Sequence, residues 1–172
     1  MNADAAKTAA QIYLQDFESE VPTTVRLLKS IPGSNLGYKP DAKSTPGLGL
    51  CRHLVLNDLW LLDGVASGSY KPVPDASDAC GLMTPADCAA HYAREMPSMI
   101  QRIEQLSGEE LARQIELFGV YKMPAVGYLS MALRHSIHHR GQLSSYARAM
   151  GGKVPAIYGP SADSASTDSA SA

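Results

Sequence analysis

The last long helix predicted from the sequence spans residues 124–150, PAVGYLSMALRHSIHHRGQLSSYARAM. Pro124 lacks an amide hydrogen and its fixed φ suits the first turn of a helix, whereas Gly151 and Gly152 are typical of a helix end. Three of the chain's five histidines fall within five consecutive residues of this segment: His135, His138 and His139. Such a concentration of histidines on one helix calls for a functional explanation.

The spacing of these histidines allows two of them to bind one metal ion. Residues four apart lie on one face of a helix, about 5–6 Å from each other, so His135 and His139 can both direct a ring nitrogen at one ion. His138 lies three residues after His135 and has the same claim, so spacing alone leaves two possible pairs. Because two helical histidines are more often a solvated or core pair than ligands, a metal site requires a third ligand.

His53 is the natural candidate for that third ligand. It lies in residues 50–64, LCRHLVLNDLWLLDG, an apolar segment predicted to form a helix that is buried on most sides. A buried imidazole needs partners for both ring nitrogens, and hydrogen bonds in the core satisfy them more often than a metal does. His91 has an equal claim by composition, although its neighbours indicate a half-exposed position. Periodicity does not choose between His53 and His91.

Other polar side chains are expected near these histidines. Three of them could line a pocket because helical spacing places them on the same faces: Asn57, Trp60 and Gln142. Asp58 and Glu95 are the carboxylates expected to be close enough to orient a ligand imidazole.

The first half of the chain predicts one helix and one long loop before residue 50. Apolar residues recur at intervals of three and four over residues 5–28, as in a helix with one buried stripe. Pro22 is predicted to kink this helix or to begin a new one. Residues 31–49 contain several prolines and glycines and therefore predict a loop.

Two further helices are predicted between residues 84 and 113. Thr84 followed by Pro85 indicates the start of a helix that runs to about residue 106, and Ser107 is expected to cap a short helix after it. Residues 116–122, ELFGVYK, are predicted to be extended but too short to imply a sheet.

Composition limits the class of protein. A chain of 172 residues with 45% hydrophobic residues is long enough for one core, and we expect one domain over residues 1–160. The low-complexity residues 161–172, SADSASTDSASA, are expected to be disordered. A net charge of −2 argues against nucleic acid as a partner, and the lack of a long apolar segment argues against a membrane and favours a cytoplasmic protein.

The cysteines predict no structural role beyond packing. Cys51, Cys80 and Cys88 are an odd number without a CxxC pair, so neither a disulfide framework nor a Cys-rich zinc site is expected. Cys51, two residues before His53, is predicted to be a small buried hydrophobic residue.

Several strings in the chain resemble a known family. HSIHHRGQL at residues 135–143, followed by YARAMGG and VPAIYG, is similar to the C-terminal signature of the DinB-like (DinB/YfiT) family of damage-inducible bacterial proteins. GYKPDAKST and CRHLVLNDLW resemble the family's N-terminal pattern, and the similarity covers roughly residues 8–160.

The resemblance implies both a fold and a site. The fold is an all-α, up-down four-helix bundle with long connecting loops. The implied ligands of a divalent metal ion are His53, His135 and His139, which selects His139 over His138. Imidazole ligands suit zinc, nickel, iron or copper. Many members of the family are homodimers.

The function implied by the resemblance is broad. Some members transfer low-molecular-weight thiols, so we expect a metal-dependent enzyme that transfers such a thiol or hydrolyses a small substrate. The alternative is a metal-binding stress-response or interaction protein without catalytic activity, since no general base or nucleophile is identifiable beyond the histidines. DNA binding is disfavoured because the chain has no basic stripe.

Overall fold

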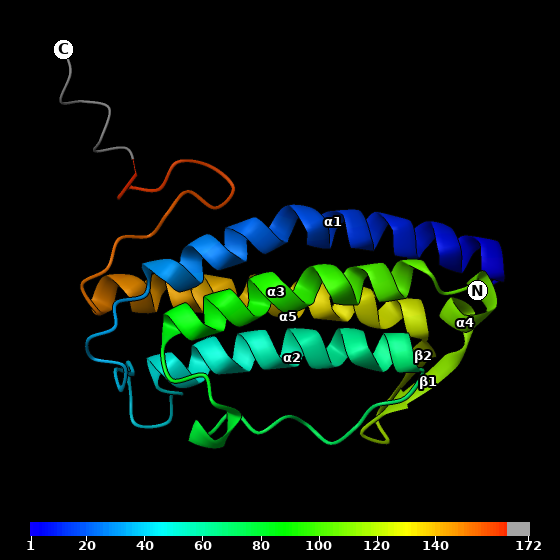
Figure 1. Ribbon diagram of the computed structural model, residues 1–172, viewed down its shortest axis with the longest axis horizontal. Helices are drawn as coiled ribbons and strands as arrows, with labels where there is room; N and C mark the ends of the chain where they lie inside the picture. The colour runs from blue at the N-terminus through cyan, green and yellow to red at the C-terminus, as the bar shows by residue number, and fades with distance from the viewer. Residues whose placement is uncertain (165–172) are drawn as a thin grey trace, which may run out of the picture.

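Four long helices form the body of the protein in a computed structural model that describes residues 1–164 (Figure 1). They are α1 (Ala3–Ser30), α2 (Gly47–Ser67), α3 (Pro85–Glu104) and α5 (Ala125–Ala149). The smaller elements are η1 (Asp78–Cys80), α4 (Gly108–Ala112), β1 (Gln114–Leu117) and β2 (Tyr121–Pro124). The predicted all-α bundle with long connecting loops is confirmed.

The direction of the helices departs from strict alternation at one step. Arg52, near the start of α2, donates from Nε to the carbonyl of Leu82 at 2.7 Å, just before α3 begins. Near the other ends of the two helices, Arg102 donates to Asp63 at 3.0 Å. Helices α2 and α3 are therefore parallel neighbours, and the predicted up-down order holds from α1 to α2 and from α3 to α5 but not from α2 to α3.

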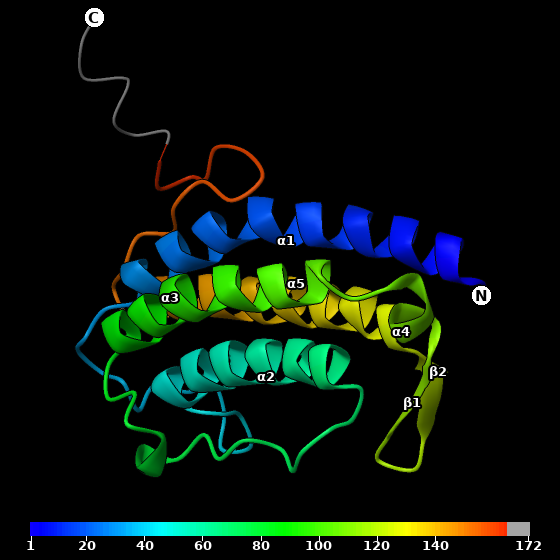
Figure 2. The same ribbon diagram turned by 45° about the vertical axis from the view of Figure 1, so that its right-hand side comes forward.

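The connection between α2 and α3 makes this parallel arrangement possible. Helix α2 has 21 residues and is therefore about 32 Å long. The connection, residues 68–84, can span roughly 55 Å when extended, which is enough to return along the whole of α2. Figure 2 shows it running along the outside of α2 from one end of the bundle to the other.

Helix α1 passes through Pro22 without a break, so no new helix begins there. Pro22 cannot donate to the carbonyl of Glu18, but both residues are exposed and water can bond that carbonyl. The ribbon of α1 is bowed along its length (Figure 1). The predicted starts of the later helices are confirmed, because Thr84 and Ser107 each form a capping box.

The segment predicted to be too short for a sheet forms a hairpin, and that prediction is wrong. Strands β1 and β2 pair antiparallel, with Ile115 opposite Met123. Phe118 and Gly119 between them both have positive φ, a backbone conformation typical of tight hairpin turns. The hydroxyl of Tyr128 on α5 donates to the carbonyl of Ile115 at 2.9 Å, so the bundle itself supports the short pair of strands.

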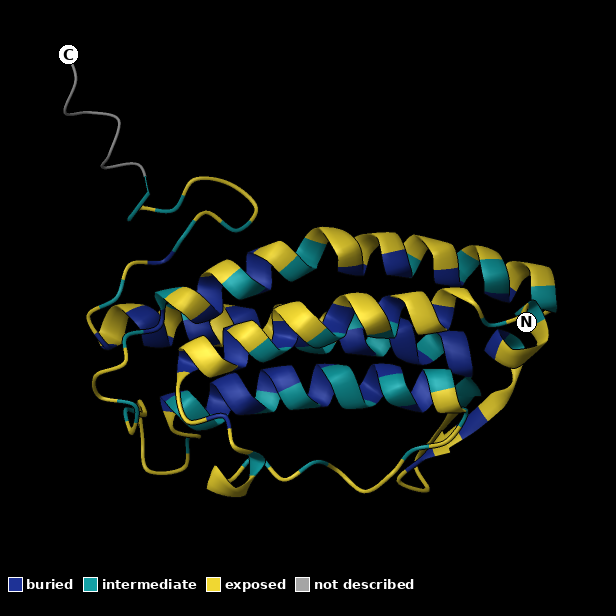
Figure 3. Cartoon of the chain, in the orientation of Figure 1, coloured by how far each residue is buried: buried dark blue, intermediate teal, exposed yellow. Residues whose placement is uncertain are grey.

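Burial separates the helices into two kinds (Figure 3). Helix α2 is buried or half-buried over most of its surface, as predicted, whereas α1 and α3 each expose one face. Cys51 is fully buried, in agreement with its predicted packing role. None of the described helices is both long enough and apolar enough to cross a membrane.

The chain after α5 folds back beside α1 (Figure 2). Asp163 accepts hydrogen bonds from Arg148 at 2.9 Å and from the amide of Val154 at 3.0 Å. Ser161 donates to the carbonyl of Val154 at 2.6 Å. The tail predicted to be disordered thus begins with residues that make defined contacts, and its remainder, residues 165–172, lies outside the described residues.

Candidate metal centre

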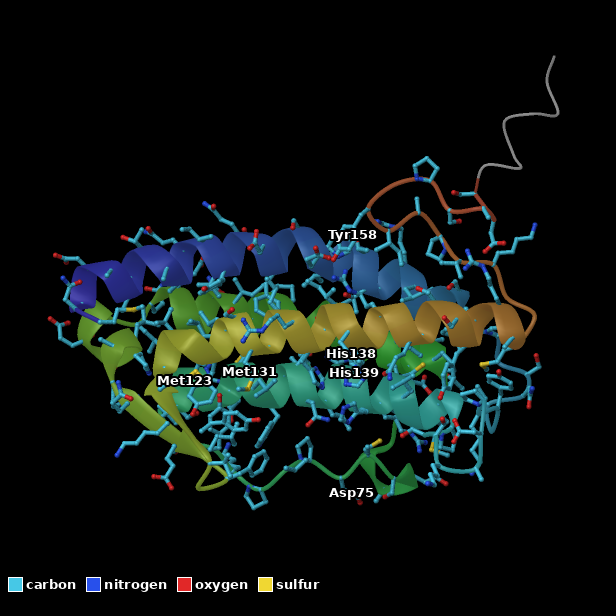
Figure 4. The ribbon with its side chains drawn as sticks, turned by 180° about the vertical axis from the view of Figure 1, so that it is seen from behind. Asp75, Met123, Met131, His138, His139 and Tyr158 are labelled. Atoms are coloured by element: carbon cyan, nitrogen blue, oxygen red, sulfur yellow. The ribbon has the colours of Figure 1, made fainter. Side chains whose placement is uncertain are left out.

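Three histidines from two helices meet between α2 and α5. His53 comes from the N-terminal half of α2, and His135 and His139 lie one turn apart on the middle of α5. Nε2 of His53 lies 3.1 Å from Nε2 of His139 and 3.2 Å from Nε2 of His135. Figure 4 shows His139 on α5 where this helix passes α2. The three Nε2 atoms therefore converge on one point.

The other ring nitrogen of each histidine contacts a different side chain. His135 donates from Nδ1 to Oδ1 of Asp58 at 2.8 Å, and His139 donates from Nδ1 to Oε1 of Gln142 at 2.7 Å. Nδ2 of the Asn57 amide lies 2.7 Å from Nδ1 of His53 and donates to the carbonyl of His53 at 3.0 Å, so this amide holds the His53 ring. With Nδ1 protonated in His135 and His139, Nε2 of each of these two rings keeps its lone pair for a ligand.

Asp58 is the most deeply placed of these supporting groups. Its carboxylate is fully buried on α2 and also accepts a hydrogen bond from the hydroxyl of Tyr92 on α3 at 3.0 Å. Burial raises the pKa of Asp58, and the contact with His135 opposes that rise. The bond from Asp58 therefore fixes the orientation of the His135 ring from inside the core.

The electrostatic environment favours neutral histidines. Burial lowers the pKa of His53, and the proximity of His135 lowers it further. Burial is also the main cause that lowers the pKa of His139 to about 4, with His135 again contributing. Neutral imidazole is the form that binds a metal, so His53 and His139 do not need to lose protons near neutral pH.

The ring geometry fits a small divalent ion. Nitrogen ligands at about 2.1 Å in a tetrahedral complex are about 3.4 Å apart. The observed separations of 3.1 and 3.2 Å are within a few tenths of an ångström of that value. Among the described residues, these three are the group of His, Cys, Asp and Glu side chains arranged to hold a metal ion.

Two open clefts adjoin the three histidines. The first, of about 420 Å³, has a mixed lining and is called the polar cleft for the polar side chains in it: Lys43, Ser44, Thr45, Gln142 and Tyr146 beside His53 and His139. The hydroxyl of Tyr146 donates to the carbonyl of Thr45 at 3.1 Å, which holds the connection after α1 against α5. The second cleft, of about 310 Å³, is mainly apolar and lies on the side of His53 and His135.

The sequence as a whole matches the model of the DinB family over residues 5–169. The chain belongs to the DinB family. Two uncharacterized proteins of Bacillus subtilis strain 168 are similar to it. YjoA is 26% identical over 78% of this chain and 86% of its own length, and YrdA is 25% identical over 86% of this chain and 87% of its own.

Solved DinB-like structures share the fold. A protein from Bacillus cereus superposes with a TM-score of 0.71 at 21% identity, covering 85% of this chain and 95% of its own. YjoA from Bacillus subtilis superposes with a TM-score of 0.65 at 23% identity, covering 86% of this chain and 99% of its own. At these identities the similarity establishes the DinB bundle and not a shared activity.

The remaining site residues considered from the sequence do not all lie at the cluster. His138 is exposed on α5, with its ring packed 4.8 Å from that of His139, and does not point into the cluster (Figure 4). His91 is half-buried on α3 and contacts Arg94 at 3.0 Å, and Glu95 pairs with the same arginine. Of the two carboxylates expected to orient a ligand, Asp58 does so and Glu95 does not.

Arg140 of the HRGQ string serves the DinB fold and not the cluster. It is buried, forms an ion pair with Glu20 on α1, and donates to the hydroxyl of Tyr158 at 2.7 Å. Both partners are side chains of the same chain, one on α1 and one after α5.

Some lining residues were missed because no local pattern marks them. Thr45 lies in a loop, and Val73 and Phe118 lie in the connection after α2 and at the tip of the hairpin. The only signal for Thr45 was the GYKPDAKST string, which contains it. This string resembles the family pattern but does not indicate a position in space.

Proposed function

We propose that His53, His135 and His139 bind one divalent metal ion and that the protein is a metal-dependent enzyme that transfers a low-molecular-weight thiol to a small electrophile. The observation that carries this proposal is the convergence of three Nε2 atoms whose rings are all oriented through Nδ1 by other side chains. Zinc, nickel and iron are the candidate ions, because imidazole suits each of them.

The surroundings of the site support an open centre in preference to a closed structural one. Three histidine ligands leave at least one position free on a four-coordinate ion, and the cluster borders two clefts that a small molecule can enter. A bound divalent ion would supply charge that lowers the pKa of a thiol near it. The protein's own contribution is to fix the three rings and to present polar groups on one side.

The lining of the clefts favours thiol transfer over hydrolysis. Neither cleft is lined by a carboxylate, so no described acidic side chain is placed to remove a proton from water there. Lys43 provides positive charge at the polar cleft, which suits an anionic thiolate or a carboxylate-bearing thiol. Tyr146 and Ser44 offer hydroxyl groups on the same side.

Reaction of a thiol with an aryl chloride tests the proposal. In this reaction a sulfur–carbon bond forms, the carbon–chlorine bond breaks, chloride leaves and the thiol proton passes to solvent. Zn(II)-, Ni(II)- and Fe(II)-loaded protein is incubated with glutathione or cysteine and 1-chloro-2,4-dinitrobenzene, and product absorbance is followed. We expect the wild-type protein and His138→Ala to show a metal-dependent rate, and His135→Ala to show none.

Two other results would redirect the proposal. Metal binding without metal-dependent consumption of any of several thiols would favour the non-catalytic metal-binding protein. Metal-dependent cleavage of an activated ester without thiol transfer would favour a hydrolase. We also propose a homodimer, on the resemblance to the family alone, and sedimentation equilibrium distinguishes it from a monomer.

A further inference from the structure

The apolar cleft beside the histidines has a wall built from three separate parts of the chain. Trp60 belongs to α2, Val73 to the connection after α2, and Phe118 to the tip of the hairpin. His53 and His135 close the cleft on the side of the metal centre. One end of this cleft therefore carries the candidate metal ligands, and the rest of its lining is mainly hydrocarbon.

Trp60 fixes the part of the wall that comes from the connection. Its indole Nε1 donates to the carbonyl of Lys71 at 2.9 Å, which holds the connection against α2 two residues before Val73. The ring of Tyr70 packs on Trp60 with a centroid distance of 5.0 Å. These two contacts hold Tyr70 and Lys71, just before Val73 in the chain, against Trp60.

The hairpin turn places Phe118 in a conformation that phenylalanine rarely adopts. Its φ is +58°, in the left-handed region where glycine or asparagine is the usual residue. Its ring nevertheless stacks on Trp60 at a centroid distance of 5.8 Å and an interplanar angle of 28°. The side chain remains 64% exposed, so the bundle gains little burial from it. Residues in sparsely populated backbone conformations cluster at active sites and ligand sites, which makes Phe118 a candidate for contact with a ligand.

The volume of the cleft suits one modest apolar group. Apolar cavities of about 150 Å³ accept benzene, and this open cleft of about 310 Å³ has room for one ring or for a chain of about six carbons. Val73 is 50% exposed, so part of the apolar wall now faces water and would be covered by such a group.

We propose that this cleft, with Trp60, Val73 and Phe118 as its wall, binds an aromatic or alkyl group of the substrate. The polar end of the same molecule then lies at the three histidines. The inference deepens the proposed function, and it rests on that function only for the position of the polar end. It assigns a substrate class, small amphiphilic molecules with an apolar group of about six carbons.

Trp60 is the only tryptophan in the chain, so its fluorescence reports on this cleft directly. Three probes distinguish binding of the apolar group in the cleft from binding of the polar end at the histidines. Each probe is titrated into the zinc-loaded protein in the absence of oxygen. Ethanethiol has a metal-binding sulfur and a short tail, hexanol has only the tail, and hexanethiol has both. Full burial of each added CH₂ strengthens binding about fourfold, so we expect hexanethiol to bind at least about tenfold more tightly than ethanethiol.

Variants of the hairpin tip test the wall itself. Phe118→Ala is expected to weaken binding of hexanol and hexanethiol at least about threefold and to leave binding of ethanethiol unchanged. Phe118→Leu is expected to restore part of the lost affinity. Val120→Ala is the matched control, because Val120 is in the same turn, is 76% exposed and does not line the cleft. Circular dichroism checks that each variant keeps its helices.

Failure of the subsite and failure of the metal proposal give different results. The subsite proposal would be overturned if hexanethiol bound less than about twofold more tightly than ethanethiol. It would also be overturned if Phe118→Ala left this ratio of affinities unchanged. Neither result would contradict the metal site. His139→Ala removes a candidate ligand that does not line this cleft, so it is expected to abolish binding of ethanethiol and to retain that of hexanol. If the wild-type protein binds no zinc, the metal proposal fails and binding of hexanol alone tests the subsite. The subsite proposal then requires that Phe118→Ala weaken this binding.

Discussion

At the scale of single residues, the cluster depends on three side chains that are not candidate ligands. Asn57 and Gln142 each lie within one turn of the histidine that they contact, whereas Asp58 reaches from α2 to His135 on α5. The contact made by Asp58 also fixes the relative position of the two helices, since its other oxygen is bonded by Tyr92 on α3. Orientation of the rings is therefore coupled to the packing of three helices.

Replacing Asp58 by asparagine tests this coupling. Asparagine keeps the shape and one acceptor oxygen but removes the negative charge that makes His135 a stronger ligand, so we expect zinc affinity to fall about 10- to 100-fold. Competition with a chromophoric chelator measures it. Asp63→Asn on the same helix is the control, because Asp63 pairs with Lys71 and Arg102 away from the histidines. An equal loss in both variants would contradict the role assigned to Asp58.

The lowered pKa values of His53 and His139 predict how stability depends on pH in the metal-free protein. In the unfolded chain these histidines bind protons below about pH 6.5, whereas folded His139 does so only near pH 4. The unfolded state therefore binds more protons between these values, and the free energy of unfolding falls as pH decreases, by up to about 1.4 kcal/mol per pH unit for each histidine.

Urea unfolding between pH 7 and pH 4.5 measures that dependence. His139→Gln removes one of the titrating groups and should flatten the decline. A variant with the same slope as the wild-type protein would show that burial does not lower the pKa of this histidine.

At the scale of elements, helix α5 has two buried faces with separate roles. One face presents His135 and His139 to α2, and the other presents Arg140 to α1. The contacts of Arg140 with Glu20 and Tyr158 join α5, α1 and the chain that follows α5. The histidine–HRGQ string therefore combines candidate ligands with a residue that fixes the helix carrying them.

Arg140→Met is expected to lower the free energy of unfolding by about 3 kcal/mol, because it leaves the half-buried carboxylate of Glu20 without its partner. Arg148 is on the same helix and forms a more exposed ion pair with Asp163. Arg148→Met should therefore lower the free energy of unfolding by less than about 1 kcal/mol. Denaturant unfolding of both variants measures the difference. Equal losses would mean that Arg140 contributes no more than a surface pair.

The elements also show what can be predicted from sequence. Local rules predicted the caps at Thr84 and Ser107 and the one-turn spacing of His135 and His139, because each depends on residues three or four apart. The choice of His53 over His91 depends on which helix packs on α5, and periodicity does not contain that information. Only the resemblance to the family made this choice.

The hairpin and the order of the helices were missed for a similar reason. The strands, Gln114–Leu117 and Tyr121–Pro124, extend beyond residues 116–122 on both sides, and their pairing depends on support from Tyr128 of α5. A long connection permits either direction for the next helix, so residues 68–84 do not distinguish parallel from antiparallel packing of α2 and α3.

At the scale of the whole molecule, the parallel packing of α2 and α3 places loops around the candidate metal centre. The connection in residues 68–84 runs outside α2 and contributes Ala76 to the polar cleft and Val73 to the apolar one (Figure 1). Figure 4 shows Asp75 in this stretch on the outer side of α2. The bundle holds the histidines, whereas the connections and the hairpin supply half of the other residues that line the two clefts.

The central claim is that three histidines bind one metal ion, and metal content of tag-free protein tests it most directly. Wild-type protein, His53→Ala, His135→Ala and His139→Ala are dialysed with one equivalent of zinc, nickel or iron, and bound metal is measured by mass spectrometry. His91→Ala and His138→Ala are the controls. We predict about one ion per chain in the wild-type protein and both controls, and loss of most of it in each of the three variants. Near-stoichiometric metal in His53→Ala and His135→Ala, or equal loss in His138→Ala, would contradict the site.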